Sequence, residues 1–244
     1  MTDAPVTPVL DISQALIEAR RLGRRTDISQ LPTPDYAEAL EIQQRVQSTL
    51  GPVGGFKVAR RAEGAPIMAP ISTSRVLPSG ADVHTDDRLG IELEIGFELI
   101  SDTVPDNIAS PNQHFRPRIV LELVDTRLEG AESDPMMKLA DMQLNAGLVV
   151  GPAIETWNGD DFGTVEGSLR CGEQQVIDGA VTVPGGSALA MLSHFLEHVG
   201  NHCGGLRQGQ ILITGSLSGL LYFPPGTHVL GRISGFGEVS CRLG

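Results

Sequence analysis

Basic residues and long apolar runs are both scarce in this chain of 244 residues. Its 18 lysines and arginines are outnumbered by 30 aspartates and glutamates, which gives a net charge of −12 at pH 7. Nucleic acids and anionic membrane surfaces attract basic patches, so this charge argues against both as partners. No run approaches the roughly 18 apolar residues of a membrane-spanning helix, and the N-terminus has no signal-peptide pattern. We expect a cytoplasmic protein that binds neither nucleic acid nor membrane.

Cysteine occurs only three times, as Cys171, Cys203 and Cys241. The odd number and wide spacing fit neither a disulfide framework nor a metal-binding motif, so we expect reduced thiols. The GxSxG elbow, the P-loop and a GxGxxG motif after a strand are also missing. Their absence leaves serine hydrolases, nucleotide-phosphate enzymes and Rossmann-type enzymes without support.

The pattern of the chain changes near residue 53. Before it, apolar residues at helical spacing predict one helix over 11–22 and a second from Thr33-Pro34-Asp35 to about residue 47. After it, short apolar segments alternate with clusters of Gly, Pro, Asn and Asp, which predicts many short strands, with one helix over 187–199. We predict an α+β fold with a helical N-terminal part, residues 1–52, and a β-rich domain, residues 53–244.

The segment 91–100 has the strongest pattern in the chain. Its apolar residues alternate with Glu92, Glu94, Gly96 and Glu98, as in a strand with two different faces. Glutamates two residues apart leave a strand from the same face, and their charges repel unless a cation lies between them. The pattern fits a divalent metal site, and it also fits an acidic outer face of an antiparallel sheet.

Two further residues stand out because of their surroundings. Glu122 is the only acid within the apolar run 119–124, where an unpaired carboxylate is costly to bury. It needs a metal, a cation such as Arg127, or solvent, and with Glu92 and Glu94 it would form an oxygen-only site suited to Mg²⁺ or Mn²⁺. Lys57, one of only two lysines, follows a glycine pair. It would bind a carboxylate or move protons, or it is a surface lysine.

Two other segments have weaker patterns. The strand predicted at 211–214 ends in a loop rich in small and hydroxyl residues, which is a simple turn or a cradle for carboxylate oxygens. His194, His198 and His202 repeat every four residues, which is compatible with a zinc site on the late helix. Since glycines follow and polar residues flank them, we favour a solvated face.

Taken in order, these pieces resemble the fumarylacetoacetate hydrolase superfamily. The similarity is greatest to its branch of 2-keto-4-pentenoate (2-hydroxypenta-2,4-dienoate) hydratases and 4-oxalocrotonate decarboxylases. It runs from about residue 50 to the end of the chain. The matching stretches are GGFKVA at 54–59, IELEIGFEL at 91–99, LELVDTRL at 121–128, NAGLVVG at 145–151, PGGSALAMLSHFLEHVG at 184–200, and LRQGQILITGSLSG followed by PPGTHVLGRISGFGEVSCRL within 206–243.

The resemblance implies a β-rich fold with a mixed, rolled sheet, a divalent metal (Mg²⁺ or Mn²⁺) and a homo-oligomer. It implies a metal-dependent lyase that acts on a 2-keto acid or 2-hydroxydienoate through a metal-stabilised enolate, with hydration as the first expected reaction. The metal ligands fall on Glu92, Glu94 and Glu122, and the active-site lysine falls on Lys57. The expected substrate contacts are Thr214, Gly215, Ser216, Thr73, Ser74 and Arg60.

The chain departs from this branch at several positions. Thr73 or Ser74 stands where an acidic residue is usual, and Asp141-Met142-Gln143-Leu144 replaces an Asp-Asn-Ala-Ser run. Loss of a general acid or base costs on the order of 10²–10⁴-fold in rate. The alternatives are a 4-oxalocrotonate-type decarboxylase and an acylpyruvate hydrolase or isomerase. Another is a catalytically weak paralogue that serves as a structural partner or acts on a different biosynthetic intermediate.

Overall fold

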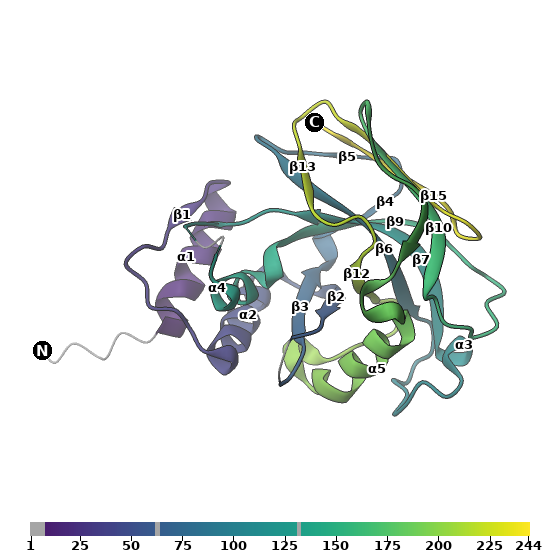
Figure 1. Cartoon of the computed structure of the whole chain (residues 1–244). Helices are drawn as coiled ribbons and strands as arrows, with labels where there is room; N and C mark the ends of the chain where they lie inside the picture. The colour runs from purple at the N-terminus through teal and green to yellow at the C-terminus, as the bar shows by residue number, and fades with distance from the viewer. Residues whose placement is uncertain (1–7, 62–63, 131–132) are drawn as a thin grey trace, which may run out of the picture.

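The computed structural model describes residues 8–61, 64–130 and 133–244 (Figure 1). The first seven residues of the predicted helical part therefore lie outside the described residues. The helices are α1 (Pro8–Leu22), α2 (Tyr36–Leu50), α3 (Pro111–His114), α4 (Pro135–Ala140) and α5 (Ala188–Val199). The strands are β1 (Thr26–Asp27), β2 (Val53–Ala59), β3 (Ile67–Ser72), β4 (Val76–Pro78), β5 (Ala81–Val83), β6 (Leu89–Leu99), β7 (Phe115–Val124), β8 (Leu128–Glu129), β9 (Asn145–Ala153), β10 (Thr164–Cys171), β11 (Gln174–Thr182), β12 (Ile211–Ser216), β13 (Leu221–Phe223), β14 (His228–Ile233) and β15 (Gly237–Leu243).

An eight-stranded sheet of mixed direction forms the centre of the molecule. Its strand order is β3-β2-β12-β6-β7-β9-β4, and β13 pairs with β6. Strand β12 runs parallel to β2 and antiparallel to β6, so a late segment of the chain joins two early ones. Strands β3 and β9 lie in contact although four strands separate them in this order, which requires the sheet to curl. The expected α+β fold with a rolled, mixed sheet is confirmed.

The outer face of the rolled sheet is covered by a second sheet and by α5 (Figure 1). The second sheet has the order β11-β10-β14-β15-β5. The main core lies between these layers and includes Leu93, Leu121, Leu169 and Phe195, each fully buried. The inner face of the roll carries a smaller apolar cluster, formed by Ile71, Val120, Leu148, Ile211 and Ile213.

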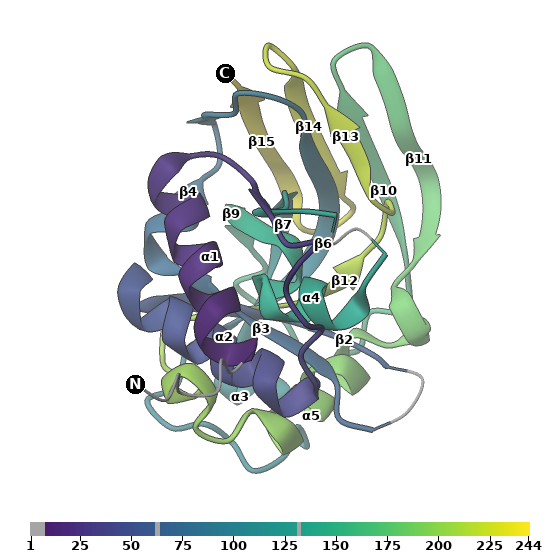
Figure 2. The same cartoon turned by 90° about the vertical axis from the view of Figure 1, so that its left-hand side faces the viewer.

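The helices α1, α2 and α4 form a separate layer against β3, as Figure 2 shows. Asp35 caps α2 through a reciprocal pair of bonds, since its side chain accepts from the Glu38 amide and the Glu38 side chain accepts from the Asp35 amide. Such a capping box satisfies two amides at the start of a helix. No helix among the described residues is long and apolar enough to cross a membrane. The boundary at residue 52 stays a prediction.

Several boundaries differ from the predicted ones. Helix α1 begins at Pro8 and is therefore longer than the apolar spacing indicates, whereas α2 runs from Tyr36 to Leu50 and lies about three residues further along the chain than predicted. The segment with Gly54, Gly55 and Lys57 is itself a strand, β2. Its glycine at 55 is needed for packing, because a Cβ atom there would lie 2.3 Å from the Ile211 carbonyl oxygen. Gly55 thus allows β2 and β12 to approach closely.

His202 leaves the face of α5 that carries His194 and His198, because the helix ends at Val199. Its Nε2 lies 2.9 Å from Gln43 Oε1, and burial lowers its pKa to about 4. The folded protein thus keeps this imidazole neutral, whereas the unfolded chain takes up a proton near the ordinary pKa of about 6.5. Stability therefore falls as the pH drops from about 6.5 to 4, at about 1.4 kcal/mol per pH unit.

We expect the free energy of unfolding of His202→Gln to fall less than that of the wild type as the pH drops from 6.5 to 4. At pH 4 the two losses should differ by up to about 3 kcal/mol. Urea unfolding at a series of pH values measures the difference. His84→Gln is the matched control, since the His84 side chain is 83% exposed. If the free energy of unfolding fell equally with pH in His202→Gln and in the wild type, the prediction would be wrong.

Candidate metal centre

Strand β6 has the two faces that its sequence predicts. Ile91, Leu93, Ile95 and Phe97 point outward into the main core, where each is at most 1% exposed. The alternate residues lie on the inner face of the roll. The acidic face therefore points into the fold, and not into solvent as on the outer face of an antiparallel sheet.

Three glutamates of the inner face converge. Glu92 lies directly opposite Glu122 in the β6–β7 register, and Glu94 is the next inner residue along β6. One carboxylate oxygen from each lies within 4.8 Å of the others, and Glu94 and Glu122 are 2% and 0% exposed. Like charges facing each other across two strands are destabilising. Such a group requires a positive charge.

Lys57 supplies one such charge from across the roll. Its Nζ lies 2.5 Å from Glu122 Oε1, with the two side chains 11% and 0% exposed. Strands β12 and β6 separate β2 from β7, so in a flat sheet the two residues would be roughly 14 Å apart. Curling of the sheet brings them together.

The pKa shifts show that one ammonium is not enough for three carboxylates. Burial raises the pKa of Glu94 well above its ordinary value, and Glu122 and Glu92 raise it further. Burial, followed by Glu122, also raises the pKa of Glu92. Burial alone would lower the pKa of Lys57, but Glu122 and the other two carboxylates outweigh it, so this pKa is raised. Negative charge is in excess at this site.

The predicted loop at 214–216 is the end of β12, which meets the carboxylates at a β-bulge between Ile213 and Ser216. The bulge directs the backbone N–H of Gly215 at Glu94 Oε2, 2.7 Å away. Gly215 has φ 112°, and a Cβ atom there would lie 2.9 Å from Pro184, so only glycine fits. The Ser216 hydroxyl lies 3.3 Å from that of Ser218. Thr214 is 2% exposed, and its hydroxyl donates to the Ile95 carbonyl.

Three predicted substrate contacts lie on other elements than the glutamates. Thr73 and Ser74 are exposed in the turn before β4, and the Ser74 hydroxyl pairs with that of Ser72. Arg60 lies over Gly185 and lines a surface hollow beside α5. Within residues 8–61, 64–130 and 133–244, no hydrogen bond or ion pair connects Arg60, Thr73 or Ser74 to the glutamate cluster. Their role in substrate binding stays a prediction.

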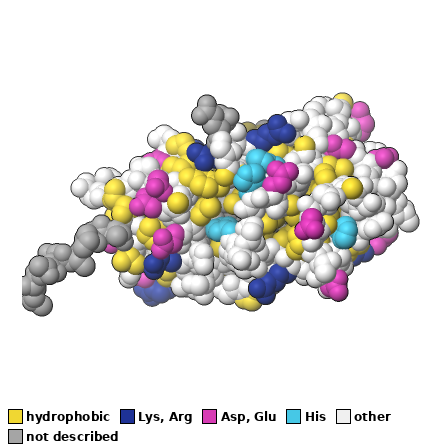
Figure 3. Space-filling model, turned by 90° about the horizontal axis from the view of Figure 1, so that it is seen from below, with side chains coloured by type: hydrophobic (Ala, Val, Ile, Leu, Met, Phe, Trp, Pro, Cys, Tyr) yellow, Lys and Arg dark blue, Asp and Glu magenta, His cyan; other side chains and the backbone are white. Residues whose placement is uncertain are grey.

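The histidine face of α5 is exposed. His194, Glu197 and His198 place potential ligand atoms within 4.8 Å of one another, while His202 is buried apart from them. Histidine and acidic side chains lie next to each other on the surface seen in Figure 3. The Nδ1 atom of His198 lies 2.8 Å from the His194 carbonyl oxygen within the same helix. This arrangement agrees with a solvated helix face.

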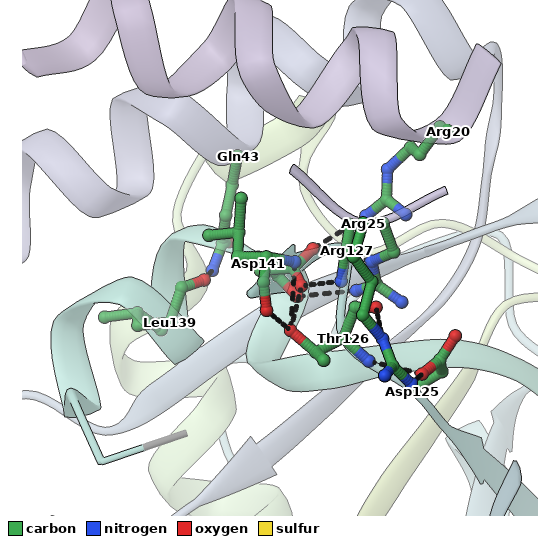
Figure 4. Close-up of polar contacts among 9 residues, drawn as sticks. Arg20, Arg25, Gln43, Asp125, Thr126, Arg127, Leu139 and Asp141 are labelled. Carbon is green, nitrogen blue, oxygen red and sulfur yellow. Dashed lines mark hydrogen bonds and ion pairs between the residues drawn. The ribbon is translucent and has the colours of Figure 1, made fainter. Parts of the chain in front are cut away.

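The site also contains residues that the sequence analysis did not select. Asn145 Nδ2 lies 2.8 Å from Glu122 Oε1, and the Gln143 carbonyl oxygen lies 3.3 Å from Lys57 Nζ. Both residues follow Asp141, which is 0% exposed and bound by Arg127 and Arg20 (Figure 4). The available signal was a polar Asn at the start of an otherwise apolar strand.

Comparison with solved structures identifies the fold. 4-Oxalocrotonate decarboxylase from Pseudomonas putida G7, complexed with magnesium and adipate, superimposes with a TM-score of 0.79 at 20% identity, covering 99% of this chain and 100% of that one. Fumarylpyruvate hydrolase from Pseudomonas aeruginosa, with Mn²⁺ and pyruvate, gives 0.56 at 15% identity over 77% and 88%. 2-Hydroxyhepta-2,4-diene-1,7-dioate isomerase from Mycobacterium marinum gives 0.57 at 13% identity over 78% and 75%.

These structural neighbours are members of the fumarylacetoacetate hydrolase superfamily. At such identities, the likeness shows that this chain shares their fold. No protein-family model and no curated protein sequence matches the chain. The chemistry of the site therefore has to be argued from its own residues.

Proposed function

From the fold that this chain shares with enzymes of the fumarylacetoacetate hydrolase superfamily, we propose that it is a divalent-metal-dependent lyase. Its substrate is a 2-keto acid or the corresponding 2-hydroxydienoate, and its first candidate reaction is hydration. The observation that carries the proposal is the convergence of Glu92, Glu94 and Glu122 with Lys57 inside the roll. Buried titratable groups with shifted pKa values are typical of functional sites.

The three glutamates fit a cation. Glu122 Oε2 is buried without a hydrogen-bond partner among the described residues, and burial, followed by the neighbouring carboxylates, raises the pKa values of Glu92 and Glu94. A donor set made only of carboxylate oxygens suits Mg²⁺ or Mn²⁺. Bound there, such a cation would supply Lewis-acid chemistry that favours the enolate form of a 2-keto acid.

The residues of the chain have separable roles in this proposal. Lys57 Nζ holds a proton next to Glu122 and can bind the substrate carboxylate or move that proton. The Gly215 amide fixes the orientation of Glu94, and the Ser216 side chain lies beside Glu92. Thr214 is 2% exposed and its hydroxyl donates to the Ile95 carbonyl, whereas Ser216 is half-buried at the end of β12, so we assign the Ser216 hydroxyl to substrate.

Decarboxylation of an oxalocrotonate-like diacid is the second candidate. The decarboxylase structure covers the whole of both chains, whereas the isomerase and hydrolase structures match about four fifths of this one. Both candidate reactions pass through an enolate of the same 2-keto acid head, so one site serves either. A homo-oligomer remains part of the proposal.

The proposal predicts metal-dependent turnover of at least one of two substrates. Protein stripped with a chelator is mixed with 2-hydroxypenta-2,4-dienoate or 2-oxohex-3-enedioate, and the ultraviolet absorbance is followed before and after Mg²⁺ or Mn²⁺ is restored. We expect no reaction without metal and loss of the dienol or enone with it. Mass spectrometry then distinguishes a gain of water from a loss of carbon dioxide.

Other outcomes would redirect the assignment. Release of a carboxylic acid from an acylpyruvate would identify a hydrolase. Absence of turnover of all these compounds by metal-loaded protein would contradict the lyase proposal and favour the structural-partner alternative.

A further inference from the structure

The segment Met142–Leu144 has an unusual backbone. All three residues have positive φ, at 53°, 49° and 63°. Residues with a side chain rarely adopt this left-handed conformation, because the Cβ atom crowds the carbonyl oxygen. Consecutive residues of this kind persist only where the surrounding structure imposes them, and such strain is concentrated at functional sites.

Contacts at both ends impose this turn. At its start, the carboxylate of Asp141 accepts from Arg127 Nε at 2.6 Å and from the Arg127 amide at 2.8 Å, and Arg127 Nη2 donates to the Asp141 carbonyl at 2.7 Å (Figure 4). At its end, the Asp125 amide donates to the Leu144 carbonyl at 2.9 Å. Met142 is buried among the helices of the N-terminal layer. The turn is therefore held on both sides.

The turn places two polar groups against the Lys57–Glu122 ion pair. It directs the Gln143 carbonyl oxygen at Lys57 Nζ and starts β9 so that Asn145, 6% exposed, donates from Nδ2 to Glu122 Oε1. Glu122 Oε1 thus receives two donors, from Lys57 and Asn145. Glu122 Oε2 is buried and receives none among the described residues. The carboxylate of Glu122 is thus hydrogen-bonded through Oε1, and its Oε2 is left available to a cation.

We propose that Asn145 is a positioning residue of the metal centre and that the Met142–Leu144 turn is the element that holds it. By occupying Glu122 Oε1, Asn145 and Lys57 leave Oε2 as the oxygen that faces the cation. An amide suits this position because it donates a hydrogen bond without adding a fourth negative charge. The inference rests on the proposed function, since it assumes that the glutamates bind a divalent cation.

The inference also explains a departure from the family pattern. Met142 and Leu144 stand where the related run has Asn and Ser, so the sequence suggests that polar groups are lost from the site. In the structure, a backbone carbonyl at residue 143 and the side chain of Asn145 supply polar contacts at this place. These two groups thus provide the polar contacts that the side chains of Met142 and Leu144 cannot make.

The test is Mn²⁺ binding to the full chain, measured by calorimetry and by electron paramagnetic resonance. We expect Asn145→Ala and the bulkier Asn145→Leu to bind Mn²⁺ more weakly by roughly 10–100-fold, which is the usual effect of losing an outer partner of a metal ligand. The resonance of the bound ion should change too, because the Glu122 carboxylate can rotate. A purely structural role would not change that spectrum.

Gln210→Ala is the matched control. Gln210 is also a buried amide, whose Nε2 donates to the Val53 carbonyl and whose Oε1 accepts from the Arg207 amide, at the far end of β12 from the bulge. Its loss should lower the unfolding temperature and leave Mn²⁺ affinity unchanged. Wild-type affinity and spectrum in both folded Asn145 variants would overturn the inference. Failure of the wild type to bind Mn²⁺ would overturn the proposed function instead.

Discussion

Glu94→Gln is expected to weaken Mn²⁺ binding by more than the roughly 10–100-fold that an outer partner contributes, and to make the metal-free protein more stable. Affinity falls because a charged ligand is lost. Stability rises because the pKa of Glu94 is raised, by burial first and then by Glu122 and Glu92, so its ionised form destabilises the fold at neutral pH. Turnover should fall with metal binding. Calorimetry with Mn²⁺ and thermal unfolding in chelator measure the two effects.

Glu98→Gln is the matched control for this variant. Glu98 lies on the same face of β6, but its Oε2 is 2.8 Å from Arg118 Nε and it is outside the cluster. We expect its loss to leave Mn²⁺ affinity unchanged and to lower stability slightly. A Glu94→Gln protein that binds Mn²⁺ as the wild type does would exclude the carboxylate site. If neither the wild type nor the variant turned over substrate, but a partner protein still needed this chain for its own activity, the structural-partner alternative would be favoured.

Lys57→Met is expected to separate chemistry from metal binding. Loss of the proton-carrying group should lower turnover by on the order of 10²–10⁴-fold. Mn²⁺ affinity should be kept or increased, because loss of the ammonium leaves more net negative charge at the site while Asn145 still holds Glu122 Oε1. The metal-free variant should be less stable by about 3 kcal/mol or more, since Glu122 is left buried without its ion pair. Binding of Mn²⁺ to the folded state should restore part of this stability.

The other lysine provides the control for Lys57→Met. Lys138 lies in the last turn of α4, away from the cluster, so Lys138→Met should change neither turnover nor metal affinity. Metal affinity that disappears together with Lys57 would show that the lysine is needed to assemble the site. Turnover that survives its loss would remove Lys57 from the proton-transfer role.

Local sequence patterns predicted the parts of this protein whose causes are local. The alternation of Ile91, Glu92, Leu93 and Glu94 set the two faces of β6, because side chains alternate along a strand. The isolated acid Glu122 in an apolar run indicated a need for a metal, a cation such as Arg127, or solvent. The structure pairs it with Lys57, whereas Arg127 binds Asp141. The four residues that the sequence favoured most strongly are therefore neighbours in the fold.

Features that depend on distant parts of the chain could not be predicted in the same way. The curl of the sheet decides that Lys57 meets Glu122, and no local pattern encodes that curl. The proposed role of Asn145 could not be predicted from the sequence for a similar reason. Its importance follows from a left-handed turn held by Asp141, 121 residues away in sequence from its partner Arg20.

The position of β12 has a consequence for how the chain is made. This strand lies between β2 and β6, and it brings the Gly215 amide to Glu94. During synthesis, β2, β6 and β7 leave the ribosome long before β12 does. The emerging chain therefore contains β6 without its neighbour β12, and the carboxylates of β6 are exposed to water until β12 is available. Contacts of such long sequence separation also form slowly. The site is thus completed late in biosynthesis, after every other strand of the eight-stranded sheet except β13 has been translated.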